Sequence, residues 1–94
     1  MRFASVRLII FKNPEGDYAG KIIEELGLKG YQVGGAMISE KHANFIVNTG
    51  LASAKDVLTL IELIKQKVYL KKGIVLEEEV KYFNINKKVR AMVL

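Results

Sequence analysis

Residues 53 to 73 read Ser-Ala-Lys-Asp-Val-Leu-Thr-Leu-Ile-Glu-Leu-Ile-Lys-Gln-Lys-Val-Tyr-Leu-Lys-Lys-Gly, and this stretch decides the class of fold. Ser53 followed by Asp56 is the acidic form of a capping box, which starts a helix, and Gly73 is suited to end it. Apolar residues recur at helical spacing between these signals and form one stripe, while the lysines fall largely on the solvated side. The stripe consists of Val57, Leu60, Ile61, Ile64 and Val68.

The segments around this helix predict a small sheet. Residues 3–11 alternate in polarity and are rich in β-branched and aromatic types, which is typical of a strand with one buried face. Residues 36–39 and 44–48 predict two short strands around the polar turn Glu40-Lys41-His42, and residues 74–83 predict a final strand. Residues 28–35 contain three glycines and predict a loop with short extended pieces.

A second, shorter helix is predicted after the turn at residues 13–16. Asp17 is the expected cap, and Gly27 is the expected stop. Its buried stripe would be Ala19, Ile22, Ile23 and Leu26. Strands and helices alternate irregularly, so we expect an α+β fold in which two helices pack on one face of a small, mostly antiparallel sheet.

Composition limits what the chain can be. With 94 residues it should form one domain over residues 1–94, with residues 84–94 as a tail or an extra strand. It contains no cysteine and one histidine, His42, so we expect no metal site. We expect neither a membrane span nor a signal peptide, which predicts a cytoplasmic protein. The net charge of +5 attracts anions, but the tyrosines are too dispersed to predict nucleic-acid binding.

Four groups of residues could carry chemistry. Lys12-Asn13, at a strand end, could hold a phosphate, or could be an ordinary turn with a solvated lysine. Lys29, near several glycines, could approach an anion, or could lie in a purely structural loop. His42 could bind phosphate or simply face water. Among residues 77–79, three consecutive glutamates, one could act as an acid in a cleft, or all could protect a strand edge.

Taken in order, these stretches resemble the C-terminal, substrate-binding domain of UDP-N-acetylenolpyruvoylglucosamine reductases. The resemblance runs from residue 11 to residue 83 and is closest to the shorter type of that family. The longest matching run, from Ser39 to Gly50, is the most specific. The matching segments are Phe11-Lys-Asn-Pro14, Gly16-Asp-Tyr-Ala-Gly20, Leu28-Lys-Gly-Tyr31 with Gly34-Gly35-Ala36, Ser39-Glu-Lys-His-Ala-Asn-Phe-Ile-Val-Asn-Thr-Gly50, Ala54-Lys-Asp-Val57 and Leu76-Glu-Glu-Glu-Val80.

The resemblance implies a substrate site. The family reduces the enolpyruvyl ether of UDP-N-acetylglucosamine with NADPH and FAD in peptidoglycan synthesis. Asn13, Lys29 and His42 match positions that contact the substrate around its diphosphate, and we place Lys12 with them. Glu79 matches the glutamate that stabilises or helps to protonate the intermediate, a role for which burial would keep the carboxyl group neutral.

The departures from the family are equally informative. The family has a Gly-Ser pair, whose serine donates the proton, where this chain has Leu8-Ile9. Glu78 replaces a family proline, and residues 84–94 match nothing in the resemblance. The catalytic arginine and the flavin pocket belong to N-terminal parts of the family, so we expect no cofactor site in this chain.

Three functions follow as expectations. The first is a domain that binds a UDP-sugar and is not catalytically competent alone. The second is half of a split reductase, completed by a separate flavin-binding chain. The third is a non-catalytic, self-associating protein, possible as a homodimer through the apolar segments 6–11 and 89–94.

Overall fold

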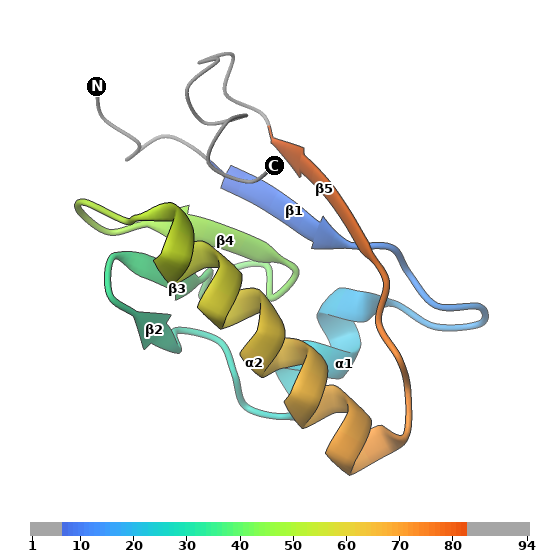
Figure 1. Ribbon diagram of the computed structural model, residues 1–94. Helices are drawn as coiled ribbons and strands as arrows, with labels where there is room; N and C mark the ends of the chain where they lie inside the picture. Colours follow the sequence, from blue (N-terminus) through green and yellow to red (C-terminus); the bar gives the residue numbers. More distant parts are fainter. Residues whose placement is uncertain (1–6, 83–94) are drawn as a thin grey trace.

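The computed structural model describes residues 7–82, which form one antiparallel sheet with two helices on one face (Figure 1). The strand order is β2-β3-β4-β1-β5, and every neighbouring pair in it is antiparallel. This confirms the expected α+β fold. In chain order the elements are β1 (Arg7–Phe11), α1 (Ala19–Glu25), β2 (Gln32–Val33), β3 (Ala36–Ile38), β4 (Phe45–Asn48), α2 (Ala54–Lys72) and β5 (Glu78–Tyr82).

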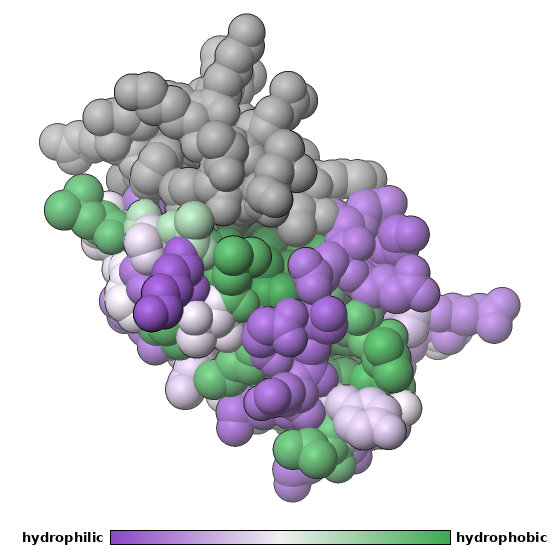
Figure 2. Space-filling view, in the orientation of Figure 1, coloured by the Kyte–Doolittle hydropathy of each residue, from purple (hydrophilic) through white to green (hydrophobic). Residues whose placement is uncertain are grey.

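The core lies between α2 and the sheet. The five residues of the predicted stripe on α2 are all buried, as are Leu8 and Ile10 of β1, Ile38 of β3 and Ile46 of β4. Among the described residues no polar or charged side chain is fully buried. The opposite side of α2 faces solvent, and Figure 2 shows this face as mostly hydrophilic, with separate hydrophobic patches. The amphipathic pattern of α2 therefore fixes which sheet face is covered.

The ends of α2 follow the sequence signals. The Ser53 hydroxyl accepts a hydrogen bond from the Asp56 backbone N–H at 3.0 Å, and the Asp56 carboxylate accepts one from the Ser53 N–H at 3.1 Å. Gly73 adopts a left-handed conformation with φ of 69°, which a side chain would disfavour. The capping box and the glycine stop are both confirmed.

The start of α1 differs from the prediction. The N-cap position is Tyr18, not Asp17, and the Tyr18 side chain makes no capping bond. Asp17 instead accepts a hydrogen bond from the neighbouring Tyr18 N–H at 2.7 Å. The first amide of the helix, that of Ala19, donates to Oδ1 of Asn13 at 2.9 Å. An asparagine six residues earlier thus satisfies the amide that the predicted aspartate cap was expected to serve.

The strands are shorter than the sequence pattern suggests. Residues 3–6 of the first predicted strand, and residues 84–94, lie outside the described residues. The last strand begins at Glu78 instead of residue 74, because Leu76 turns into the core on the way from α2. No helix in residues 7–82 is both long and apolar enough to cross a membrane.

Candidate functional site

The sheet brings most of the candidate residues to one end. Because neighbouring strands are antiparallel, β1 and β3 finish at the end where β4 and β5 begin. Lys12 and Asn13 follow β1, His42 precedes β4, and Glu79 is the second residue of β5. The loop with Lys29 reaches the same end, since the Gly30 N–H donates to the Ile38 carbonyl at 2.8 Å.

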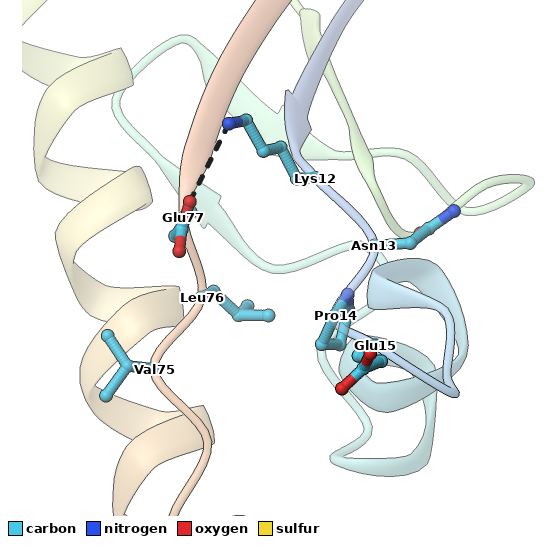
Figure 3. A pocket seen from close by; sticks show the side chains of 7 residues that line it. All are labelled: Lys12, Asn13, Pro14, Glu15, Val75, Leu76 and Glu77. Atoms are coloured by element: carbon cyan, nitrogen blue, oxygen red, sulfur yellow. Dashed lines mark ion pairs between the residues drawn. The ribbon is translucent and has the colours of Figure 1, made fainter.

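Lys12 lines a small hollow of about 250 Å³. Its ammonium group lies 3.7 Å from Oε1 of Glu77, and both side chains are at least half exposed. The Lys12 N–H also donates to the Glu77 carbonyl at 2.9 Å, so backbone and side chains both join the end of β1 to the segment before β5. Figure 3 shows the ammonium group directed at Glu77, while the side chain of Asn13 points away from it.

Asn44 joins the end of β1 to the start of β4. Its Oδ1 accepts a hydrogen bond from the Phe11 N–H at 3.0 Å, and its Nδ2 donates to the Phe11 carbonyl at 2.9 Å. The side-chain amide therefore pairs with Phe11 as a further strand residue would. Sequence reasoning assigned Asn44 no role. Its position between a turn and a strand was the available signal, because asparagine amides often bond to backbone there.

His42 lies in a second hollow, of about 540 Å³, on the sheet face away from the helices. Its exposed ring packs against Phe45, with centroids 5.1 Å apart and planes tilted by 41°. The turn before it is tied by the Ser39 hydroxyl, which accepts hydrogen bonds from the Lys41 and His42 N–H groups at 3.1 and 3.2 Å. Lys12 and His42 thus line different hollows at the same end of the sheet.

Lys29 is less free than the sequence suggests. Its ammonium group lies 3.2 Å from a carboxylate oxygen of Glu24, and the lysine side chain is 29% exposed. The glycine pair at 34–35 does not join it, because the Gly35 N–H already donates to the Asp56 carboxylate at 3.1 Å. The anion that these glycines accommodate therefore comes from the protein itself.

The three glutamates have separate environments. Glu78 points to the helix side, where its carboxylate lies 2.9 Å from the Lys65 ammonium group. This hydrogen bond, before any other cause, raises the pKa of Lys65. Glu79 alternates to the opposite sheet face, and it is exposed. Glu79 is thus not buried within residues 7–82, and its role in the reaction stays a prediction.

Ile9 stands where the resemblance placed a proton-donating serine. It is partly exposed on the sheet face away from the helices, with Phe45 and Lys81 as its register partners. An aliphatic side chain has no proton to donate. Residues 7–82 also contain no cluster of three or more metal-binding side chains.

Comparison with known proteins gives consistent results. Residues 9–83 match the family model described as UDP-N-acetylenolpyruvoylglucosamine reductase, C-terminal domain. A reductase of that name from Prochlorococcus marinus is 62% identical over 72 residues, which cover 77% of this chain and 24% of the relative. The UDP-N-acetylenolpyruvoylglucosamine reductase 2 of Symbiobacterium thermophilum is 57% identical over 77 residues, 82% of this chain and 25% of the relative.

A solved structure agrees with the sequence relatives. The crystal structure of the Thermus caldophilus UDP-N-acetylenolpyruvylglucosamine reductase superposes with a TM-score of 0.64 at 51% identity, covering 78% of this chain and 25% of that one. The chain therefore spans about a quarter of the length of the relatives that it matches.

Proposed function

Because the chain belongs to the UDP-N-acetylenolpyruvoylglucosamine reductase family, through the C-terminal domain of that family, we propose that it binds a UDP-N-acetylglucosamine-type ligand. The proposed site is the end of the sheet where Lys12, Asn13 and His42 lie. The observation that carries the proposal is the convergence of these residues, from separate matching segments, on one end of the sheet.

The chemistry of these side chains suits a diphosphate. Lys12 is half exposed, and its contact with Glu77 at 3.7 Å is a surface ion pair, which typically contributes only about 0 to 1 kcal/mol. A diphosphate could therefore replace Glu77 as the partner of Lys12 at small cost. The His42 ring adds a directional N–H donor, and Lys29 can exchange Glu24 for the ligand in the same way.

We assign no flavin or NADPH site to residues 7–82. A dinucleotide commonly binds with its diphosphate at free amides of a helix that follows a strand. Here the first amide of the helix after β1, that of Ala19, is already bonded to Asn13. One of the amides that this mode of cofactor binding would use is therefore already taken, and Ile9 offers no proton at the position of the family serine. On this proposal the described domain binds the ligand and does not itself perform the reduction.

Titration calorimetry of the full chain with UDP-N-acetylglucosamine at millimolar concentration tests the proposal. Lys12→Ala and His42→Ala should each weaken binding by about threefold to tenfold, in keeping with ~1 kcal/mol for one exposed polar contact. Lys67→Ala is the matched control, since Lys67 is an exposed lysine on α2 that lines neither hollow. Absence of heat at millimolar ligand, or equal weakening in the control, would exclude the site.

The coverage of the relatives favours a second candidate function. Since the match spans about a quarter of each relative, the chain could act as the substrate-binding half of a reductase whose flavin part is a separate chain. If this second function is correct, NADPH is oxidised only when this chain and the flavin-binding chain are both mixed with the enolpyruvyl substrate. Unchanged absorbance at 340 nm after mixing would count against it.

A further inference from the structure

Asn44 lies where three elements meet. Its side-chain amide makes both hydrogen bonds to the Phe11 backbone, and its own carbonyl accepts a third from the Ile10 N–H at 3.1 Å. A Cβ atom on Gly20, in α1, would lie 3.7 Å from the Cβ atom of Asn44, so the helix packs directly on this residue. Asn44 therefore contacts the end of β1 and the start of α1 from the start of β4.

These contacts fix the segments that carry the candidate ligand residues. Lys12 directly follows Phe11, so the amide of Asn44 holds the last residue before it in strand geometry. His42 lies two residues before Asn44, in a turn closed by the Phe45 N–H, which donates to the His42 carbonyl at 2.9 Å. Without the Asn44 amide, both polar backbone groups of Phe11 would lose these partners and the strand end could fray.

Asn48, at the other end of β4, provides an internal comparison. Its Oδ1 also makes two hydrogen bonds to backbone, accepting from the Gly50 and Ala52 N–H groups at 2.9 and 3.1 Å. Those bonds shape the connection to α2 at the opposite end of β4, although Asn48 also lines the hollow in which His42 lies. The two asparagines thus make equal numbers of side-chain bonds to backbone at opposite ends of one strand.

We propose that Asn44 is the positioning residue of the nucleotide-sugar site: it holds the Lys12 and His42 segments in a fixed relative position without contacting the ligand. The ligand-binding part of this inference rests on the proposed function. The positioning part does not rest on it, because it concerns how rigidly the two segments are held in the protein without ligand.

Hydrogen exchange of the free chain, followed by NMR, tests the positioning part. In Asn44→Ala, exchange of the Lys12 N–H should accelerate at least tenfold relative to amides inside α2, such as that of Leu60. The Lys12 N–H bonds to Glu77 and not to Asn44, so faster exchange reports lost order and not a lost partner. In Asn48→Ala the ratio of Lys12 to Leu60 exchange should stay within twofold of the parent. Equal acceleration of all amides in Asn44→Ala would show a merely global effect and overturn the proposal.

Calorimetry with UDP-N-acetylglucosamine tests the ligand-binding part at a temperature where each variant is folded. Asn44→Ala should weaken binding at least tenfold, and the control Lys67→Ala, whose side chain lines neither hollow, less than twofold. If the parent chain binds no ligand, the proposed function fails while the exchange result still decides the role of Asn44. If the parent binds and Asn44→Ala binds equally well, the role in the site is excluded. Should Asn44→Ala fail to fold, Asn44→Asp, which keeps the acceptor for the Phe11 N–H, replaces it in both measurements.

Discussion

The carboxylate of Asp56 accepts a hydrogen bond from the backbone N–H of Gly35 at 3.1 Å, in addition to closing the capping box of α2. One side chain thus ends the β2–β3 turn and begins the long helix. The glycine pair is needed for this contact, because a Cβ atom on Gly34 would overlap the Asp56 carboxylate. The contact ties the edge of the sheet to the helix that covers it.

The Asp56 contact predicts a pH dependence of stability. The backbone hydrogen bond from Ser53, followed by that from Gly35, lowers the pKa of Asp56 from its ordinary value. A lowered pKa in the folded state stabilises the fold above the ordinary pKa of roughly 4, and this stabilisation is lost as the pH falls towards the lowered value. Asp56→Asn should therefore lower the urea midpoint at pH 7 and flatten its decline as the pH falls below about 4. Parallel pH curves for the parent and the variant would contradict this assignment.

Gly35 should be intolerant of a side chain. A Cβ atom there would lie 2.5 Å from the backbone nitrogen of Ala52, and backbone cannot move aside cheaply. Gly35→Ala should lower the free energy of unfolding by about 1 to 3 kcal/mol. Gly50→Ala is the matched control, since that site is open, and its change should stay within about 0.5 kcal/mol. Chemical denaturation of both variants checks the difference, and equal stabilities would refute the close packing.

Two leucines of α2 lie on different sides of the helix, one facing the core and one facing solvent. Leu60 is fully buried, whereas Leu58 is 47% exposed. Leu60→Ala should destabilise the fold by about 2 to 5 kcal/mol, because it removes buried methyl groups and leaves a cavity. Leu58→Ala, the same substitution on the other side, should change stability by less than about 1 kcal/mol. A Leu58→Ala cost comparable to that of Leu60→Ala, measured by urea unfolding, would mean that a further surface covers this side of α2.

The ion pair between Lys65 and Glu78 should contribute little. The two groups lie 2.9 Å apart, but about a third of each side chain remains exposed. A double-mutant cycle with Lys65→Met and Glu78→Gln should give a coupling free energy of about 0.2 to 1 kcal/mol, reduced in 1 M salt. Because the pKa of Lys65 is raised in the fold, the coupling should persist at neutral pH and disappear as the pH rises through that raised value. A coupling insensitive to salt would indicate that the pair is shielded from solvent.

The sequence alone determined α2 and the class of fold. The capping box, the apolar stripe and Gly73 are signals between residues close in the chain, so each could be found without knowing the tertiary structure. The same holds for the three buried residues of α1, Ala19, Ile22 and Ile23, which all belong to the predicted stripe. The fourth residue of that stripe, Leu26, is the C-cap and is only partly buried. The matching segments likewise identified the family.

Only the tertiary structure decided how the site is held together. Asn44 bonds to Phe11 across 33 positions, and Asp56 bonds to Gly35 across 21. A polar side chain with several possible hydrogen-bond partners bonds to the one that folding brings close to it. The local sequence does not specify which distant residue that will be. For the same reason, Asn13 and not Asp17 bonds to the first amide of α1, and Lys12 and His42 share one end of the sheet only because the strands around them are antiparallel.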